Sequence, residues 1–167
     1  WTVAKLKFFA SMRGGFAFSS DEYLDDGVQI LKIGNLYQSC LDLDRAPIFV
    51  GDHLLYTLPE FVVREGDVLM SLTGTLGKRD YGFAVQVEAD GPFLLNQRVA
   101  NVSPTLGRVS SRYLICALRS EPYLAQLYSL PSGTKQANLS NADVLNIPVA
   151  VPPSLEEQEE VASNLQT

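Results

Sequence analysis

Two polar segments of this chain combine turn-forming residues with side chains that can bind an anion or the edge of a base. The first runs from Thr73 to Arg79 and includes Thr75. Its glycines let backbone amides approach an anion closely, and Lys78 and Arg79 add positive charge. The second is the run Asn96-Gln97-Arg98. Asn and Gln can form two hydrogen bonds with adenine, and Arg with guanine, so these segments favour recognition.

A third segment and a single arginine extend this polar set. Residues 132–138 contain a tight-turn residue, Gly133, followed by the hydrogen-bonding side chains of Thr134, Lys135, Gln136 and Asn138. Arg13, beside Gly14-Gly15, is a fourth candidate. Each segment taken alone also fits an ordinary solvated turn. Their joint presence, without a catalytic set of residues, favours a binding function.

Residues suited to catalysis are few. His53 is the only histidine, and Cys40 and Cys116 have neither disulfide-framework nor zinc-ligand spacing. The stretch around Gly77 and Lys78 fails the phosphate-loop pattern, because Leu72 replaces its first glycine and Arg79 replaces the magnesium-binding Ser or Thr. We therefore predict no catalytic residues, no metal, no cofactor and no enzymatic activity for this chain alone.

Strands and turns dominate the first two thirds of the sequence. The pattern of apolar residues and Gly or Asn turns predicts strands over 5–10, 29–33, 36–43 and 68–72. Residues 83–88 alternate with period two, Asp90-Gly91 is a turn signal, and 95–102 returns, which predicts a hairpin. Regular strand–helix–strand alternation is lacking, so a mixed α+β fold is expected.

Helix signals follow strong capping residues. Ser19 with Glu22 and Ser140 with Asp143 have capping-box spacing, and Ser110 or Ser111 can cap a helix that Pro122 breaks or restarts. Residues 147–151 predict a strand. Pro152-Pro153 ends it, and Ser154 opens a last helix with an apolar stripe. The stripe consists of Leu155, Val161, Ala162 and Leu165.

The charge of the chain is unevenly distributed. Its formal net charge is -6, which by itself argues against a nucleic-acid partner. Residues 78–140, however, carry seven basic and four acidic residues, whereas residues 141–167 carry five acidic and no basic ones. Exposed charges more than about 8 to 10 Å apart are screened at physiological salt, so the local balance decides what a surface attracts. The middle of the chain is therefore compatible with phosphate binding.

Four segments, in order, are similar to segments of the specificity subunits of type I restriction-modification systems. The resemblance covers nearly the whole chain, and its most specific part is the Pro-Pro-x-x-Glu-x-Gln ending. The segments are Gln29 to Asn35, Gly66 to Ser71 with Gly74, Thr75 and Gly77, Leu95 to Val99, and Gly133 to Gln158. The net acidity departs from what a DNA-binding domain leads one to expect.

The resemblance implies a target-recognition domain that reads one half of a bipartite site in double-stranded DNA. It implies a curved sheet or partial barrel with flanking helices over residues 1–153, and the start of a spacer helix over 154–167. It adds Lys32 and Asn35 to the candidate DNA contacts. It also implies docking of methyltransferase (modification) subunits and, through them, of the restriction subunit, to which we assign Leu155, Val161 and Leu165.

Two alternatives remain open from the sequence. The domain could belong to a fused single-chain modification enzyme, with a methyltransferase module before Trp1. The acidic ends and the apolar stripe of the last helix also fit a protein-interaction module without DNA affinity. No apolar run approaches the roughly 18 to 20 residues that span a bilayer. A cytoplasmic protein without a membrane partner is the expectation.

Overall fold

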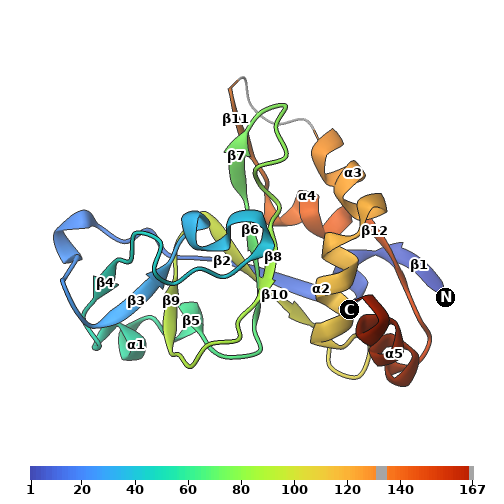
Figure 1. Ribbon diagram of the computed structural model, residues 1–167, viewed down its shortest axis with the longest axis horizontal. Coiled ribbons are helices and arrows are strands. Elements are labelled where there is room, and N and C mark those ends of the chain that lie inside the picture. Colours follow the sequence, from blue (N-terminus) through green and yellow to red (C-terminus); the bar gives the residue numbers. More distant parts are fainter. Residues whose placement is uncertain (131–134, 166–167) are drawn as a thin grey trace.

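The structure is a computed structural model, and it describes residues 1–130 and 135–165. It is a mixed α+β arrangement: a central sheet has helices on one side, a second β-rich lobe on the other, and a two-stranded ribbon that projects away from both (Figure 1). In the part of the chain that is described, the sheets stay open and do not close into a barrel. The predicted α+β class with a curved sheet and flanking helices is confirmed.

The central sheet has the strand order β2–β10–β6–β8, with every pair antiparallel. The strands are β2 (Ala10–Gly14), β10 (Val99–Pro104), β6 (Val68–Ser71) and β8 (Ala84–Gln86). Side chains of a strand point alternately to its two faces. Val68 and Met70 of β6 enter the core under the helices, whereas Leu69 enters a second core. The predicted apolar strand over 68–72 is confirmed, and burial on both faces explains its unbroken apolar run.

Helices α2 (Ser111–Arg119), α3 (Glu121–Ser129), α4 (Asn141–Asn146) and α5 (Leu155–Leu165) lie on one side of this sheet (Figure 1). Three of them begin where the capping residues predict, and at α5 the Ser154 hydroxyl accepts the N–H of Glu157 (3.2 Å). The Ser110 hydroxyl accepts the N–H of Tyr113 (3.1 Å), and the Ser140 hydroxyl accepts the N–H of Asp143 (3.1 Å). Such caps satisfy amides that lack a partner inside the helix. Pro122 stands in the first turn of α3, as expected for a helix restart.

The second lobe is built on a sheet of order β4–β3–β9–β5. Its strands are β4 (Phe49–Val50), β3 (Val28–Leu31), β9 (Phe93–Leu95) and β5 (Val62–Val63), and β3 and β9 run parallel. Short helices accompany it: η2 (Ser20–Glu22), α1 (Leu54–Thr57) and η4 (Pro59–Phe61). The predicted Ser19–Glu22 capping box is present at η2. A separate apolar core that includes Ile30 and Leu94 fills the lobe.

The first and last strands of the domain pair with each other. β1 (Thr2–Lys5) is antiparallel to β12 (Pro148–Val151), so the two ends of the described chain lie on the same side of the molecule (Figure 1). The strand predicted over 5–10 is wrong, because the 3-10 turn η1 (Leu6–Phe8) separates β1 from β2. Leu6 is fully buried there, and its N–H donates to the Ile147 carbonyl (2.9 Å). The turn carries the chain from one sheet to the next.

Two further predictions fail because distant residues decide the pairing. β8 pairs with β6, and β9 leaves for β3 and β5, so the hairpin predicted between 83–88 and 95–102 does not form. The alternating stretch 36–43 is not a strand, since the 3-10 helix η3 (Ile33–Ser39) occupies its first half. Leu36 is buried in the same core as Leu69, and Leu41 and Leu43 pack against that core. Core packing without strand pairing produces the same apolar pattern.

Candidate nucleic-acid interface

The projecting ribbon brings two of the polar segments together. Its strands are β7 (Thr73–Thr75) and β11 (Gln136–Asn138), which pair antiparallel with Thr75 opposite Gln136 and Thr73 opposite Asn138. Gln136 and Asn138 are exposed, whereas Ala137 between them is fully buried. Because strand side chains alternate, both polar groups of β11 lie on one face of the ribbon.

Backbone hydrogen bonds attach the remaining polar segment, the loop Asn96-Gln97-Arg98, to the base of this ribbon. The N–H of Leu72, the residue before β7, donates to the Arg98 carbonyl (3.0 Å). The Leu72 carbonyl accepts the N–H of Leu139, the residue after β11 (2.8 Å). Arg98 therefore adjoins the point at which both ribbon strands leave the central sheet.

The loop of residues 96–98 also forms backbone hydrogen bonds with two N-terminal segments. The N–H of Asn96 donates to the Leu31 carbonyl (3.1 Å), next to Lys32. The N–H of Gln97 donates to the Phe16 carbonyl (2.9 Å), three residues after Arg13. Segments far apart in sequence thus converge, and we call their exposed or half-buried polar residues the polar edge. It comprises Arg13, Lys32, Thr75, Lys78, Arg79, Asn96, Gln97, Arg98, Lys135, Gln136 and Asn138.

Two glycines permit this close assembly. A Cβ on Gly15 would lie 2.1 Å from the Asn96 carbonyl oxygen, so only glycine lets the end of β2 reach the loop after β9. A Cβ on Gly74, in the middle of β7, would lie 2.5 Å from Asp80 Oδ1 and 2.8 Å from the Tyr81 side chain. The geometry of the polar edge therefore depends on the close approach of Gly15 to the backbone of Asn96 and of Gly74 to the side chains of Asp80 and Tyr81.

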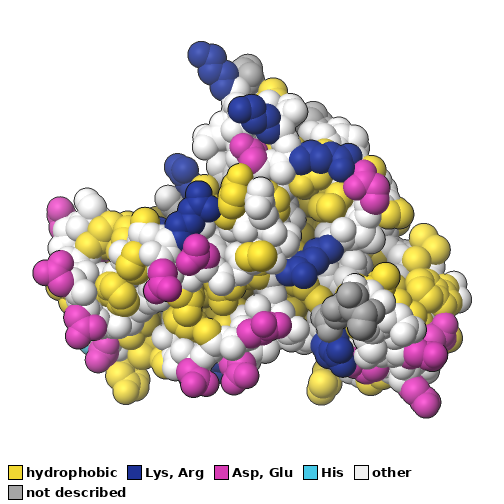
Figure 2. Space-filling model, in the orientation of Figure 1, with side chains coloured by type: hydrophobic (Ala, Val, Ile, Leu, Met, Phe, Trp, Pro, Cys, Tyr) yellow, Lys and Arg dark blue, Asp and Glu magenta, His cyan; other side chains and the backbone are white. Residues whose placement is uncertain are grey.

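Basic side chains gather on this part of the surface. Lys and Arg lie along the ribbon and in the notch between it and the second lobe, whereas Asp and Glu gather toward the outer and lower margins (Figure 2). Lys78, Arg98 and Lys135 are exposed, and within residues 1–130 and 135–165 none of them makes a hydrogen bond through its side chain or an ion pair. Their charge is available to an anion. The net charge of -6 therefore does not describe this face.

The two basic residues of the polar edge that come from the N-terminal segments, Arg13 and Lys32, each donate a hydrogen bond to a backbone carbonyl. Arg13 Nη1 donates to the Glu60 carbonyl (3.3 Å), and Lys32 Nζ donates to the Ala46 carbonyl (2.8 Å). Partial burial lowers the pKa of the Lys32 ammonium from its ordinary value. Both partners are neutral carbonyls, so the charges of Arg13 and Lys32 are not cancelled by these bonds.

The loop after β7 is shaped by a carboxylate. Asp80 Oδ1 accepts the N–H of Thr75 (2.7 Å), and the N–H of Lys78 donates to the Thr75 carbonyl (3.0 Å). Gly77 adopts a positive φ of 79° in this turn. Desolvation opposes ionisation of Asp80, but hydrogen bonds from Thr75 and the charge of Lys78 leave the pKa of its carboxyl lowered. The ionised carboxylate therefore holds the loop that presents Lys78.

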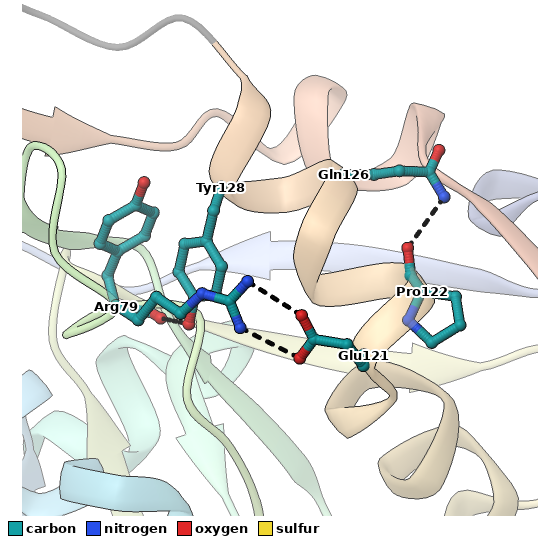
Figure 3. A network of polar contacts seen from close by, with 6 residues as sticks. Arg79, Glu121, Pro122, Gln126 and Tyr128 are labelled. Atoms are coloured by element: carbon teal, nitrogen blue, oxygen red, sulfur yellow. Dashed lines mark hydrogen bonds and ion pairs between the residues drawn. The ribbon is translucent and has the colours of Figure 1, made fainter.

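Arg79 is tied to helix α3. Its guanidinium donates two hydrogen bonds to Glu121, from Nη1 to Oε2 (3.0 Å) and from Nη2 to Oε1 (2.9 Å), and it lies over the Tyr128 ring at 5.0 Å from the centroid (Figure 3). Residue types gave no reason to expect Glu121 or Tyr128 near the polar segments. Glu121 carries only the signal of an acidic residue in the first turn of a helix.

Three predicted contacts are not part of the polar edge. Asn35 is fully buried, accepts the Lys32 N–H (2.9 Å) and donates to the carbonyls of Asp42 (2.8 Å) and Arg45 (3.2 Å), so its amide is consumed inside the fold. Thr73 is also buried, and its hydroxyl lies 3.3 Å from Asn138 Oδ1. We withdraw both as DNA contacts for this reason. Thr134 lies outside the described residues.

The residues assigned to partner binding divide into two groups. Leu155 and Leu165 of α5 are exposed, whereas Val161 is half-buried and packs against the core of the domain. Helix α5 is anchored by Gln158, which is 1% exposed and which the sequence signalled only as part of the Pro-Pro-x-x-Glu-x-Gln ending. Its amide oxygen accepts the Ser110 N–H (2.9 Å), and its amide nitrogen donates to the carbonyls of Arg108 (2.8 Å) and Pro152 (3.2 Å).

Neither a metal site nor a membrane span emerges from the described residues. Among residues 1–130 and 135–165, no three His, Cys, Asp or Glu side chains are arranged to hold a metal ion. No helix in these ranges is long and apolar enough to cross a membrane.

Comparison with known proteins gives a consistent result. A family described as "Type I restriction modification DNA specificity domain" matches residues 1–167. The chain is 28% identical over its full length to the "Type I restriction enzyme MjaVIII specificity subunit" of Methanocaldococcus jannaschii, of which it spans 39%.

Two solved structures share the fold. An S subunit of a type I restriction-modification system from M. genitalium superposes with a TM-score of 0.69 at 14% identity, covering 99% of this chain and 38% of that one. The HsdS subunit from Thermoanaerobacter tengcongensis superposes with a TM-score of 0.68 at 20% identity, covering 99% and 36%. The chain thus spans less than two fifths of each of these relatives.

Proposed function

The chain belongs to the family of type I restriction modification DNA specificity domains, and from this premise we propose that the polar edge binds one half of a bipartite DNA target. The observation that carries the proposal is the convergence of three polar segments around Leu72, at the base of the ribbon. A domain of this length is about 40 Å across and covers about one turn of duplex, so it would read a few base pairs.

The polar edge supplies two kinds of contact. Lys78 and Lys135 stand at the far end of the ribbon, exposed and unpaired among the described residues, which suits contacts to phosphate. Gln97 and Arg98 lie at its base on a loop held by backbone bonds to Phe16 and Leu72. A side chain on a backbone held in place is pre-organised to discriminate between base edges. We therefore assign base reading to this loop.

The rest of the system is proposed on the same premise. The domain directs methyltransferase subunits and, through them, a restriction subunit, and it carries out no catalysis itself. The family, a family of DNA specificity domains, fits the prediction that the chain is not an enzyme. The relative from Methanocaldococcus jannaschii is named a specificity subunit, which favours a separate subunit over a fused modification enzyme. Leu155 and Leu165 are the exposed apolar residues of α5 that would meet a partner.

The test compares phosphate-contact and base-contact variants in the assembled complex. Lys78→Ala or Lys135→Ala should lower the slope of log affinity against log salt by about 1 without changing the preferred sequence. Arg98→Ala should cost about 1 to 3 kcal/mol at one base position of the site.

Arg64→Ala is the matched control for Arg98→Ala. Like Arg98→Ala, this substitution removes one positive charge. Arg64 lies in the turn before β6, whereas the base of the ribbon lies beyond the other end of that strand. Equal binding of all duplexes by the wild-type complex would refute base reading. Equal losses for the Arg64 and Arg98 variants would refute the assignment to the loop.

A further inference from the structure

The contact between Arg79 and Glu121 joins the loop of the ribbon to the first residue of helix α3. Both terminal nitrogens of the guanidinium are bonded, at 3.0 and 2.9 Å, to the two carboxylate oxygens (Figure 3). The side chains stay 58% and 66% exposed. An ion pair this exposed changes an equilibrium by only about two- to five-fold. The pair is therefore ordered but weak enough to be exchanged.

Tyr128 holds the guanidinium in a defined position on a second side. Its ring lies under Arg79 at 5.0 Å, and its hydroxyl donates to the Tyr81 carbonyl (2.8 Å). The Tyr81 and Tyr128 rings meet edge to face at 5.1 Å, which fixes the ring plane. Arg79 thus keeps its place on Tyr128 whichever anion occupies its nitrogens.

An anion can approach this position. A cavity of about 400 Å³ adjoins the guanidinium and is also lined by Arg119 and Tyr37. The Arg119 guanidinium donates to the carbonyls of Ala84 (2.9 Å) and Ser39 (2.8 Å), which are neutral and leave its charge in place. Two guanidinium groups, those of Arg79 and Arg119, therefore border the cavity, together with one carboxylate, Asp80, which accepts the Thr75 N–H (2.7 Å).

Carboxylate and phosphate make the same two-pronged contact with arginine. We propose that Glu121 is a positioning residue that occupies the place of a DNA phosphate on Arg79 and is exchanged for that phosphate when duplex binds. The inference rests on the proposed function of the polar edge. Its consequence is that α3, through one carboxylate, lowers the affinity of the domain for every duplex, since each binding event must break the pair.

The test is a double-mutant cycle in the assembled complex, with duplex affinity measured over a range of salt. Glu121→Gln should raise affinity about two- to five-fold for target and non-target duplexes alike, because Arg79 loses its competing anion. Arg79→Ala should weaken binding and lower the salt slope by about 1. In the Arg79→Ala background, Glu121→Gln should have no effect. The amide is the same size as the carboxylate and can still accept one bond from Arg79, so the variant should fold.

Glu65→Gln is the control for net charge. Glu65 is exposed in the turn before β6, at the opposite end of that strand from the ribbon. Its replacement by glutamine removes one negative charge, as Glu121→Gln does. An equal gain for Glu65→Gln would overturn the proposal, and so would a loss of affinity in Glu121→Gln that matches the loss in Arg79→Ala. If wild-type complex binds duplex but Glu121→Gln leaves affinity unchanged, only the exchange fails. If wild-type complex binds no duplex, the proposed function fails.

Discussion

Replacing Gln158 by alanine should destabilise the domain more than the loss of a polar residue from a helix usually does. The side chain is 1% exposed and forms three hydrogen bonds, to the Ser110 N–H and to the carbonyls of Arg108 and Pro152. Each such bond contributes about 1 kcal/mol net, and buried partners left unpaired cost more. Gln158→Ala should therefore lower the free energy of unfolding by about 3 kcal/mol. For a domain of this size, that corresponds to a fall in Tm of about 6 to 12 °C.

Urea unfolding followed by circular dichroism measures this loss as a shift of the midpoint at unchanged slope. Gln126→Ala is the matched control, because Gln126 is exposed and, among residues 1–130 and 135–165, its side-chain amide donates only to the Pro122 carbonyl within α3 (3.1 Å). The control should change stability by less than about 0.5 kcal/mol. Similar losses for the two variants would refute the reasoning that burial of a fully bonded amide makes Gln158 the anchor of α5.

Gln158→Glu separates hydrogen bonding from packing. A carboxylate can still accept from Ser110, but it cannot donate to the carbonyls of Arg108 and Pro152, so it should destabilise the fold more than alanine does at neutral pH. Burial should raise the pKa of this glutamate in the folded state. A raised folded-state pKa means that stability is recovered below the ordinary pKa of glutamate and lost as pH rises. A variant insensitive to pH between about 4 and 8 would contradict this account.

Three further predictions concern the polar edge. Gly15→Ala should destabilise the fold by about 3 kcal/mol in thermal unfolding, because its Cβ would lie 2.1 Å from the Asn96 carbonyl oxygen; a neutral effect would refute the close approach. Gly74→Ala should cost about 1 to 2 kcal/mol and weaken duplex binding, since its Cβ displaces Asp80 from the Thr75 N–H; binding at wild-type strength would argue against a role for the ribbon. The Asp80 carboxyl has a lowered pKa in the fold, so its stabilising effect is present above the ordinary pKa of aspartate and lost as pH falls. In Asp80→Asn, the free energy of unfolding should therefore fall less steeply as pH is lowered below the ordinary pKa of aspartate. An unchanged pH dependence would exclude Asp80 as the source of that stabilisation.

Features that depend on neighbours in sequence were predictable. The caps at Ser19, Ser110 and Ser140 satisfy amides two or three residues away, so a local pattern suffices to find them. The apolar strand over 68–72 was also predictable, because Val68, Met70 and Leu72 fill one core and Leu69 fills another. Among polar residues, the exposed donors Gln97, Arg98 and Lys135 were found from residue type and turn context alone.

The sequence by itself also determined the family, through ordered segments that cover nearly the whole chain, and the excess of positive charge in its middle. Only the tertiary structure decided which polar groups remain free. Asn35 and Gln97 both stand in polar turns, yet Asn35 is consumed by Asp42 and Arg45, whereas Gln97 is exposed. Likewise β8 pairs with β6 rather than β9, and Arg79 meets Glu121, 42 residues further along the chain. The physical reason is that pairing, burial and ion-pair formation depend on which distant residues become neighbours, and no local pattern encodes them.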